Sequence, residues 1–126
     1  MTTTTDLTTV RAAIVAALDG LDVGDGYTLS AHSGEPGAVG PNDAWPVWES
    51  SAPIGLNVSA FRTEWAVYVA LGDTERGGLV ARGDVVAAAV MTALGTMVGQ
   101  VTTAEPVSLT FANSGTRAAV RVLLTA

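Results

Sequence analysis

His32 is the first candidate for catalytic chemistry, because it is the only histidine of the chain. Ser33, Gly34 and Glu35 follow it, so a base, a nucleophile and an acid are neighbours in the sequence. A serine hydrolase needs its histidine oriented by a third group and its serine placed beside an oxyanion hole. The Gly-x-Ser-x-Gly turn that builds such a site between a strand and a helix does not occur in the sequence. We therefore expect His32 to be a solvated loop residue, and we predict no enzymatic activity.

Three aspartates interspersed with glycines bear a faint likeness to a calcium-binding loop: Asp19, Asp22 and Asp25. An EF-hand loop spaces its carboxylates two residues apart and ends on a bidentate glutamate at its twelfth position. Here the carboxylates are three residues apart, and the twelfth position counted from Asp19 is Ser30. The chain also lacks cysteine and lysine, which excludes thiolate metal sites and lysine-containing phosphate loops. We expect a helix end and a turn here, with no metal site and no cofactor.

A tryptophan-rich segment is the most distinctive motif of the sequence. Trp45 and Trp48 flank Pro46 and Val47, and they supply two of the three tryptophans. In one interpretation these rings fold back over a sheet edge as a lid. In the other they contact a partner, since tryptophan anchors carry a disproportionate share of the binding energy at protein interfaces. Both interpretations stay open at this point, and Trp45, Pro46 and Trp48 are candidate interface residues.

A polar connection at residues 72–78 is the second candidate for contacts between subunits. It contains Asp73, Glu75 and Arg76, whose side chains are able to form ion pairs with a neighbouring copy. The same composition is typical of a solvated turn between two regular elements. The solvated turn is the favoured interpretation, and the three charged residues remain interface candidates.

A pocket for a small ligand is a further alternative. It would be lined by Trp45, Trp48 and Trp65, and it would need convergent polar groups to fix the orientation of its ligand. The sequence offers few titratable groups near these tryptophans: His32, Glu35, Asp43 and Glu49.

The overall composition narrows the class of protein. The chain has 126 residues, of which 48% are hydrophobic, and a formal net charge of −6. This length and hydrophobic content predict one domain, residues 1–126, with one core. Clustered lysines and arginines supply most of the affinity for nucleic acid phosphates, so an acidic chain without lysine is a poor candidate for binding them.

The chain shows no sign of a targeting segment. Its first residues carry neither a basic group nor an apolar core, so they do not form a signal peptide. The most apolar stretch, residues 85–101, contains threonines and glycines and lacks the flanking positive charge of a membrane span. We expect a buried helix there, no membrane association, and synthesis in the cytoplasm.

The hydrophobic periodicity predicts the order of the elements. Spacings of three and four indicate two helices, at residues 7–21 and 85–99. Alternation predicts strands at 27–31, 54–60, 65–71, 107–112 and 117–124, the last two forming a hairpin. Residues 1–6 are expected to be a flexible lead-in, and residues 32–53, rich in proline and glycine, a long loop. The predicted fold class is α+β, an antiparallel sheet with two helices packed on one face.

This order of elements resembles the tail terminator family of long-tailed bacteriophages. The similar segments are the first helix, the Trp45-Pro46-Val47 motif, the strand of residues 65–71, the helix of residues 85–99 and the closing hairpin. Together they cover nearly the whole chain, although the likeness is one of pattern. The sequence departs from the family in the short connection at residues 72–78 and in its glycine-rich first loop.

The resemblance implies a structural virion protein, made in the host cytoplasm and located in the tail or neck. Members of the family form a ring, here expected to be hexameric, that caps the tail tube and joins it to the head or neck. The implied partners are further copies of the chain, the tail tube and the connector proteins, and DNA passes through the lumen without specific binding. The alternatives are another neck or head-tail connector protein of the same virion, or a small-ligand-binding α+β module.

The long loop is the segment expected to reach a partner. Ordering many glycine, proline and serine residues is unfavourable unless contacts compensate for the lost entropy. Within residues 32–53, Trp45 and Trp48 have enough surface area to anchor such a contact. We therefore predict that Trp48→Ala leaves a folded subunit that is impaired in its incorporation into particles.

Overall fold

A five-stranded sheet organises the part of the chain that the computed structural model describes, residues 7–24, 26–54, 57–71, 76–111 and 115–126. The strand order is β1-β2-β3-β5-β4, with β1 parallel to β2 and all other neighbours antiparallel. The predicted α+β class is confirmed, and the two-residue β1 makes the sheet mixed rather than purely antiparallel. The elements are α1 (Leu7–Leu18), β1 (Ser30–Ala31), β2 (Asp43–Ile54), β3 (Asn57–Ala70), α2 (Arg76–Met97), β4 (Gln100–Phe111) and β5 (Gly115–Thr125).

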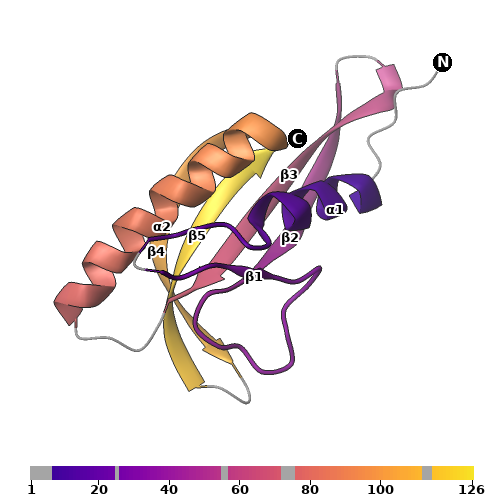
Figure 1. Ribbon diagram of the computed structural model, residues 1–126. Coiled ribbons are helices and arrows are strands. Elements are labelled where there is room, and N and C mark those ends of the chain that lie inside the picture. Colours follow the sequence, from indigo (N-terminus) through magenta and orange to yellow (C-terminus); the bar gives the residue numbers. More distant parts are fainter. Residues whose placement is uncertain (1–6, 25, 55–56, 72–75, 112–114) are drawn as a thin grey trace.

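Both helices pack on the same face of this sheet (Figure 1). The helices contribute fully buried aliphatic residues, Ile14 and Leu18 from α1 and Val90 and Leu94 from α2. Every second residue of the two central strands points toward them, because successive side chains of a strand alternate between faces. These strand residues are Trp65, Val67 and Val69 of β3 and Val120, Val122 and Leu124 of β5.

The first helix forms where its apolar residues recur at spacings of three and four, and it ends at Leu18, three residues before the predicted end. Gly20 follows with a φ of 76°, a left-handed conformation that favours glycine. The Gly20 N–H donates to the Leu29 carbonyl at 2.9 Å, which ties the helix end to the chain before β1. The lead-in predicted at residues 1–6 lies outside the described residues.

The prediction of a long loop at residues 32–53 is wrong for the second half of that range. From Asp43 onward the chain forms β2, which pairs with β3 in antiparallel register. Pro46 and Pro53 concealed this strand in the sequence, because proline cannot donate to a ladder of hydrogen bonds. An edge strand tolerates proline, and within the described part of the chain β2 has no further neighbour beyond its short pairing with β1.

Other boundaries also differ from the sequence predictions. The two strands predicted over residues 54–60 and 65–71 are not separate, since Asn57–Ala70 is one strand that follows β2 in a hairpin. The strand predicted at residues 27–31 is reduced to Ser30–Ala31. β4 begins at Gln100, seven residues before the predicted start at residue 107. The prediction missed its first half because most of those residues are exposed and do not alternate clearly between apolar and polar.

The second helix starts earlier than predicted. It begins at Arg76 instead of residue 85 and passes through Gly83 and Asp84. A helix tolerates an interior glycine at a cost of roughly 1 kcal/mol, so the Gly-Asp pair does not have to end it. Within the described residues, no helix is long and apolar enough to cross a membrane.

Two glycines near the end of α2 differ in their surroundings. The sequence predicts a close approach of a backbone to Gly95 or Gly99. A Cβ added to Gly99 would collide with the Thr125 carbonyl oxygen, so this glycine does allow such an approach. A Cβ at Gly95 would meet nothing within 4 Å, and Gly95 is exposed. Close packing on the protein's own sheet is therefore found at Gly99 and not at Gly95, and a subunit contact at Gly95 stays a prediction.

Both long edges of the sheet are interrupted. In β2 the pairing register shifts between Trp48 and Ser50, and Pro46 lies close to that point. In β4 the register shifts between Val101 and Thr103, and Pro106 lies farther along the strand. Prolines and bulges at an edge hinder the addition of a further strand. Strand-to-strand extension is therefore disfavoured at either side.

Candidate functional site

The structure separates the residues of the tryptophan motif. Because side chains alternate along β2, Trp45 and Trp48 point to opposite faces of the sheet. Trp45 is only 3% exposed and belongs to a cluster on the face away from the helices, whereas Trp48 is 46% exposed. Pro46 is buried on the helix side with Ala44, two residues before it. Trp65 also lies on the helix side, so the three tryptophans do not line one pocket.

The structure describes only part of the charged connection at residues 72–78. Asp73 and Glu75 lie outside the described residues, and Arg76 is the first residue of α2. Residues 76–78 were predicted to belong to a turn but are helical, whereas residues 72–75 lie outside the described residues.

We call the face of the sheet that lies opposite the helices the open face, and an aromatic cluster occupies one part of it. Trp45 of β2 stacks on Tyr68 of β3 with the ring centroids 5.9 Å apart and the planes inclined by 22°. Phe111 of β4 meets Trp45 edge-on at 5.9 Å and 71°. Such offset and edge-to-face pairs are favourable beyond the area that they bury. Val39, from the loop before β2, packs against this cluster and covers Trp45.

A shallow cavity of about 390 Å³ lies over this cluster. Glu35 and Thr110 line it together with the three aromatic residues of the cluster. Val47 and Leu109 extend the lining along β2 and β4, and both are half-buried. The open face therefore presents aromatic and aliphatic surface that the fold of one chain covers only in part.

A charged row crosses the open face next to the aromatic cluster. Arg121 of β5 donates to Glu105 of β4 at 2.8 Å and to Glu49 of β2 at 3.3 Å. Its Nε–H donates to the Tyr68 hydroxyl at 3.1 Å. This one guanidinium thus joins side chains from all four long strands. The hydrogen bond to Glu105 raises the pKa of Arg121 above its already high ordinary value, with smaller contributions from Tyr68 and Glu49.

The charge of Arg121 consequently does not change near neutral pH. A raised pKa means that the folded state holds the proton more tightly than the unfolded state. The stability gained from the Arg121 proton is fully present below its unfolded pKa and fades only in strongly alkaline solution. Two carboxylates around one guanidinium leave the row with a net negative charge.

His32 and Asp43 come together as a clasp that closes the loop before β2. The His32 Nε2 lies 3.0 Å from the Asp43 Oδ1, and the other carboxylate oxygen accepts the Gly40 N–H at 2.7 Å. The His32 N–H donates to the Ala44 carbonyl at 2.8 Å, which continues the pairing of β1 with β2. These contacts assign the pair a role in loop geometry.

The acidic residues near the end of α1 also have local structural roles. The Asp22 carboxylate accepts the Gly24 N–H at 2.9 Å, and the Asp19 carboxylate lies 3.3 Å from the Ala31 N–H. Asp25 lies outside the described residues. Among the residues with described positions, no group of three or more histidines or acids is arranged to hold a metal ion.

Trp48 has a different setting from the open face. Its indole N–H donates to the Ser51 hydroxyl at 3.0 Å, and the ring is half exposed beside the bulge of β2. Nearby, Arg11 of α1 places its guanidinium 5.2 Å from the Trp65 ring centre and donates to the Ser33 carbonyl at 2.6 Å. Arg11 thereby fastens α1 to the start of the loop.

Sequence reasoning identified Trp45 but missed its neighbours on the open face. Alternation places Tyr68 on the opposite face from Trp65 and Val67, and this signal was present in the sequence. Arg117 and Arg121 share one face of β5, because residues separated by an even number along a strand point to the same side. The row through Glu49 and Glu105 had no local signal, because it depends on which strands are neighbours.

The arrangement on the open face is suited to binding another macromolecule. Tyrosine, tryptophan and arginine are enriched in protein interfaces, and half-buried apolar groups gain from further burial. The charged row would fix the orientation of a partner through complementary charge. Comparison with known proteins adds no family to this description, because neither the protein-family models nor the curated proteins contain a match to the chain.

Proposed function

We propose that this chain is a structural virion protein, a ring-forming subunit of the tail terminator type at the head-proximal end of a bacteriophage tail tube. The observation that carries the proposal is the one-sided covering of the sheet. Helices bury one face, whereas the open face keeps half-buried aromatic and aliphatic groups beside a charged row. A subunit that continues its packing through a neighbour would have such a face.

The kind of contact that the open face allows is compatible with a ring. A contact between two different surfaces of identical subunits closes into a ring when the rotation between them is correct. The interrupted edges of the sheet disfavour strand addition, so the open face of one copy would meet another surface of the next. The proposed ring is hexameric, and its partners are the tail tube and the neck proteins.

The charge of the chain is compatible with a DNA path through the ring. The net charge is −6, and a negative lumen repels phosphates instead of holding them. In this proposal DNA passes without specific binding, and the subunit performs no catalysis.

Locating the chain in particles is the direct test. We expect an electron microscopy map of virions from the encoding genome to show six copies in a ring between the tail tube and the neck. A position elsewhere in the neck would favour the connector alternative. A gene that lies far from capsid, portal and tail genes, with no copies in particles, would contradict the proposal.

A matched pair of variants tests the role of the open face. Leu109→Glu places a charge among the half-buried apolar groups of the open face, whereas Ala88→Glu places the same charge on the exposed side of α2. We expect both variants to fold, as judged by circular dichroism, and only Leu109→Glu to be lost from particles. Normal incorporation of Leu109→Glu would show that the ring contact lies elsewhere.

A further inference from the structure

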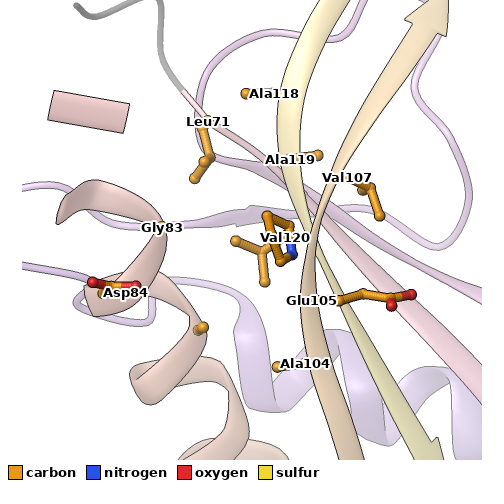
Figure 2. A pocket seen from close by; sticks show the side chains of 11 residues that line it. Leu71, Gly83, Asp84, Ala104, Glu105, Val107, Ala118, Ala119 and Val120 are labelled. Atoms are coloured by element: carbon orange, nitrogen blue, oxygen red, sulfur yellow. The ribbon is translucent and has the colours of Figure 1, made fainter. Parts of the chain in front are cut away.

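A second cavity lies on the helix side of the sheet, between α2 and the β4–β5 hairpin (Figure 2). Its volume is about 330 Å³. Gly83 and Ala87 of α2 form one wall, and Ala104, Pro106 and Ala118 of the strands form the facing wall. Further apolar lining comes from Leu71, Val107, Ala119 and Val120. The cavity lies apart from the aromatic cluster of the open face, although Glu105 of the charged row belongs to its lining.

The cavity exists because α2 has small residues, Gly83 and Ala87, where it faces Ala104 and Ala118 of the strands. Farther along the same side of the helix, Val90 and Leu94 fill the space between helix and sheet and are fully buried. At Gly83 and Ala87 the helix presents a hydrogen atom and a methyl group instead. A Cβ at Gly83 would lie 3.7 Å from a Leu71 methyl carbon and 4.0 Å from a Val120 methyl carbon, which is ordinary contact distance. Part of the space is therefore an unfilled position in an otherwise close-packed layer.

The walls are preformed. The strands that carry Ala104 and Ala118 pair along nearly their whole length, and the packed half of α2 holds the helix in place. A ligand entering such a site does not have to order the chain, which removes a large part of the usual cost of binding.

The chemistry of the lining selects the ligand. Figure 2 shows the carboxylates of Asp84 and Glu105 on opposite sides of the cavity, the first at α2 and the second beyond β4. Glu105 is directed to Arg121 on the open face, 2.8 Å away. The described side chains therefore offer a ligand in this half-open cavity almost no polar partner apart from the two carboxylates at its sides.

We propose that this cavity, hereafter the α2 cavity, is a binding site for a small, neutral, apolar ligand such as a short aliphatic chain. The size lies within the range of small-molecule sites, and the lining matches apolar groups. The two carboxylates at its sides and the absence of a basic residue from the described lining disfavour an anionic head group. The proposal does not depend on the proposed ring function.

The test uses alanine methyl groups as reporters, because alanines line the site. In protein labelled at alanine methyls, 1-octanol is titrated and followed by NMR. Saturable shifts are expected at Ala87, Ala104 and Ala118, and none at the exposed Ala88. Octanoate, with the same chain and an anionic head, is expected to bind at least tenfold more weakly. Shifts that never saturate, or that are equal at Ala88, would overturn the proposal, and equal affinity for octanoate would overturn its preference for neutral ligands.

Two adjacent residues give the matched variants. Ala87→Leu fills the α2 cavity, whereas Ala88→Leu adds the same side chain on the exposed side of the helix. Octanol binding is expected to be lost in Ala87→Leu and unchanged in Ala88→Leu. Should Ala87→Leu fail to fold, Gly83→Ala adds one methyl group at an acceptable distance and should weaken binding several-fold. Unchanged affinity in a folded Ala87→Leu or Gly83→Ala variant would contradict the assignment.

Discussion

The two faces of the sheet are built from different kinds of side chain. The helix side buries valines, leucines and Trp65 between two layers, and its largest residues are fully inaccessible. The open face carries Trp45, Tyr68, Phe111 and Arg121, and apart from Trp45 these side chains remain half exposed. The first face is built to hold one chain together. The second has the composition of an interface, with a stable fold beneath it.

Trp65→Ala is expected to have the largest effect on stability. Trp65 is 0% exposed, its indole N–H donates to Thr63 at 2.9 Å, and Arg11 lies over its ring. Removing a buried tryptophan side chain costs about 3–5 kcal/mol of unfolding free energy. Urea denaturation of the variant beside Trp65→Phe measures this loss. A cost below about 1 kcal/mol would show that the helix side is not the main core.

Arg121→Met tests the open face by removing its central charge. The loss is expected to be about 1 kcal/mol, because partly exposed ion pairs contribute little and the Met chain keeps the apolar contacts. The difference from wild type should shrink at high salt, which screens exposed charges. Arg62→Met, at an exposed position on β3, serves as the control with no expected effect. A loss as large as that of Trp65→Ala would remove the distinction between the two faces.

Gly95→Ala examines the outer surface of the helical layer. The added methyl group meets nothing within 4 Å, and alanine is favoured over glycine in a helix, so we expect a gain of about 1 kcal/mol. Thermal unfolding measures the gain. Gly99→Ala is the contrasting variant, since its methyl group would collide with the chain at Thr125, and it should lower the melting temperature.

Trp48→Ala should change stability least, by no more than about 0.5 kcal/mol, because the ring is half exposed. The prediction that this variant is nevertheless poorly incorporated into particles concerns assembly. Quantifying the subunit in purified particles, next to Leu109→Glu, tells which surface makes the contact. Normal incorporation of Trp48→Ala together with loss of Leu109→Glu would assign the contact to the open face alone.

The regular elements with strong periodicity were predictable from the sequence. The apolar spacing in α1 and the alternation in β5 are local signals, and both elements appear close to where they were expected. β2 was missed because Pro46 and Pro53 argue against a strand unless its edge position is already known. The edge position follows from the strand order, which no local pattern contains.

Predicting the candidate site from the sequence would have required the strand order even more than predicting β2 did. Glu49 and Arg121 are 72 residues apart and meet only because β5 lies between β3 and β4. The placement of Trp45 and Trp48 on opposite faces required the knowledge that both belong to one strand. Once the strands are fixed, alternation alone identifies Tyr68 and Arg121 as neighbours on the open face.

The interrupted edges of the sheet affect whether copies of the chain aggregate before they assemble. Long exposed strand edges promote stacking into amyloid-like fibres, in which each backbone pairs with the next copy. Here Pro46, Pro106 and the two register shifts interrupt such pairing at both sides. Copies accumulating to high concentration would therefore avoid uncontrolled fibre growth, and would remain available for association through their faces.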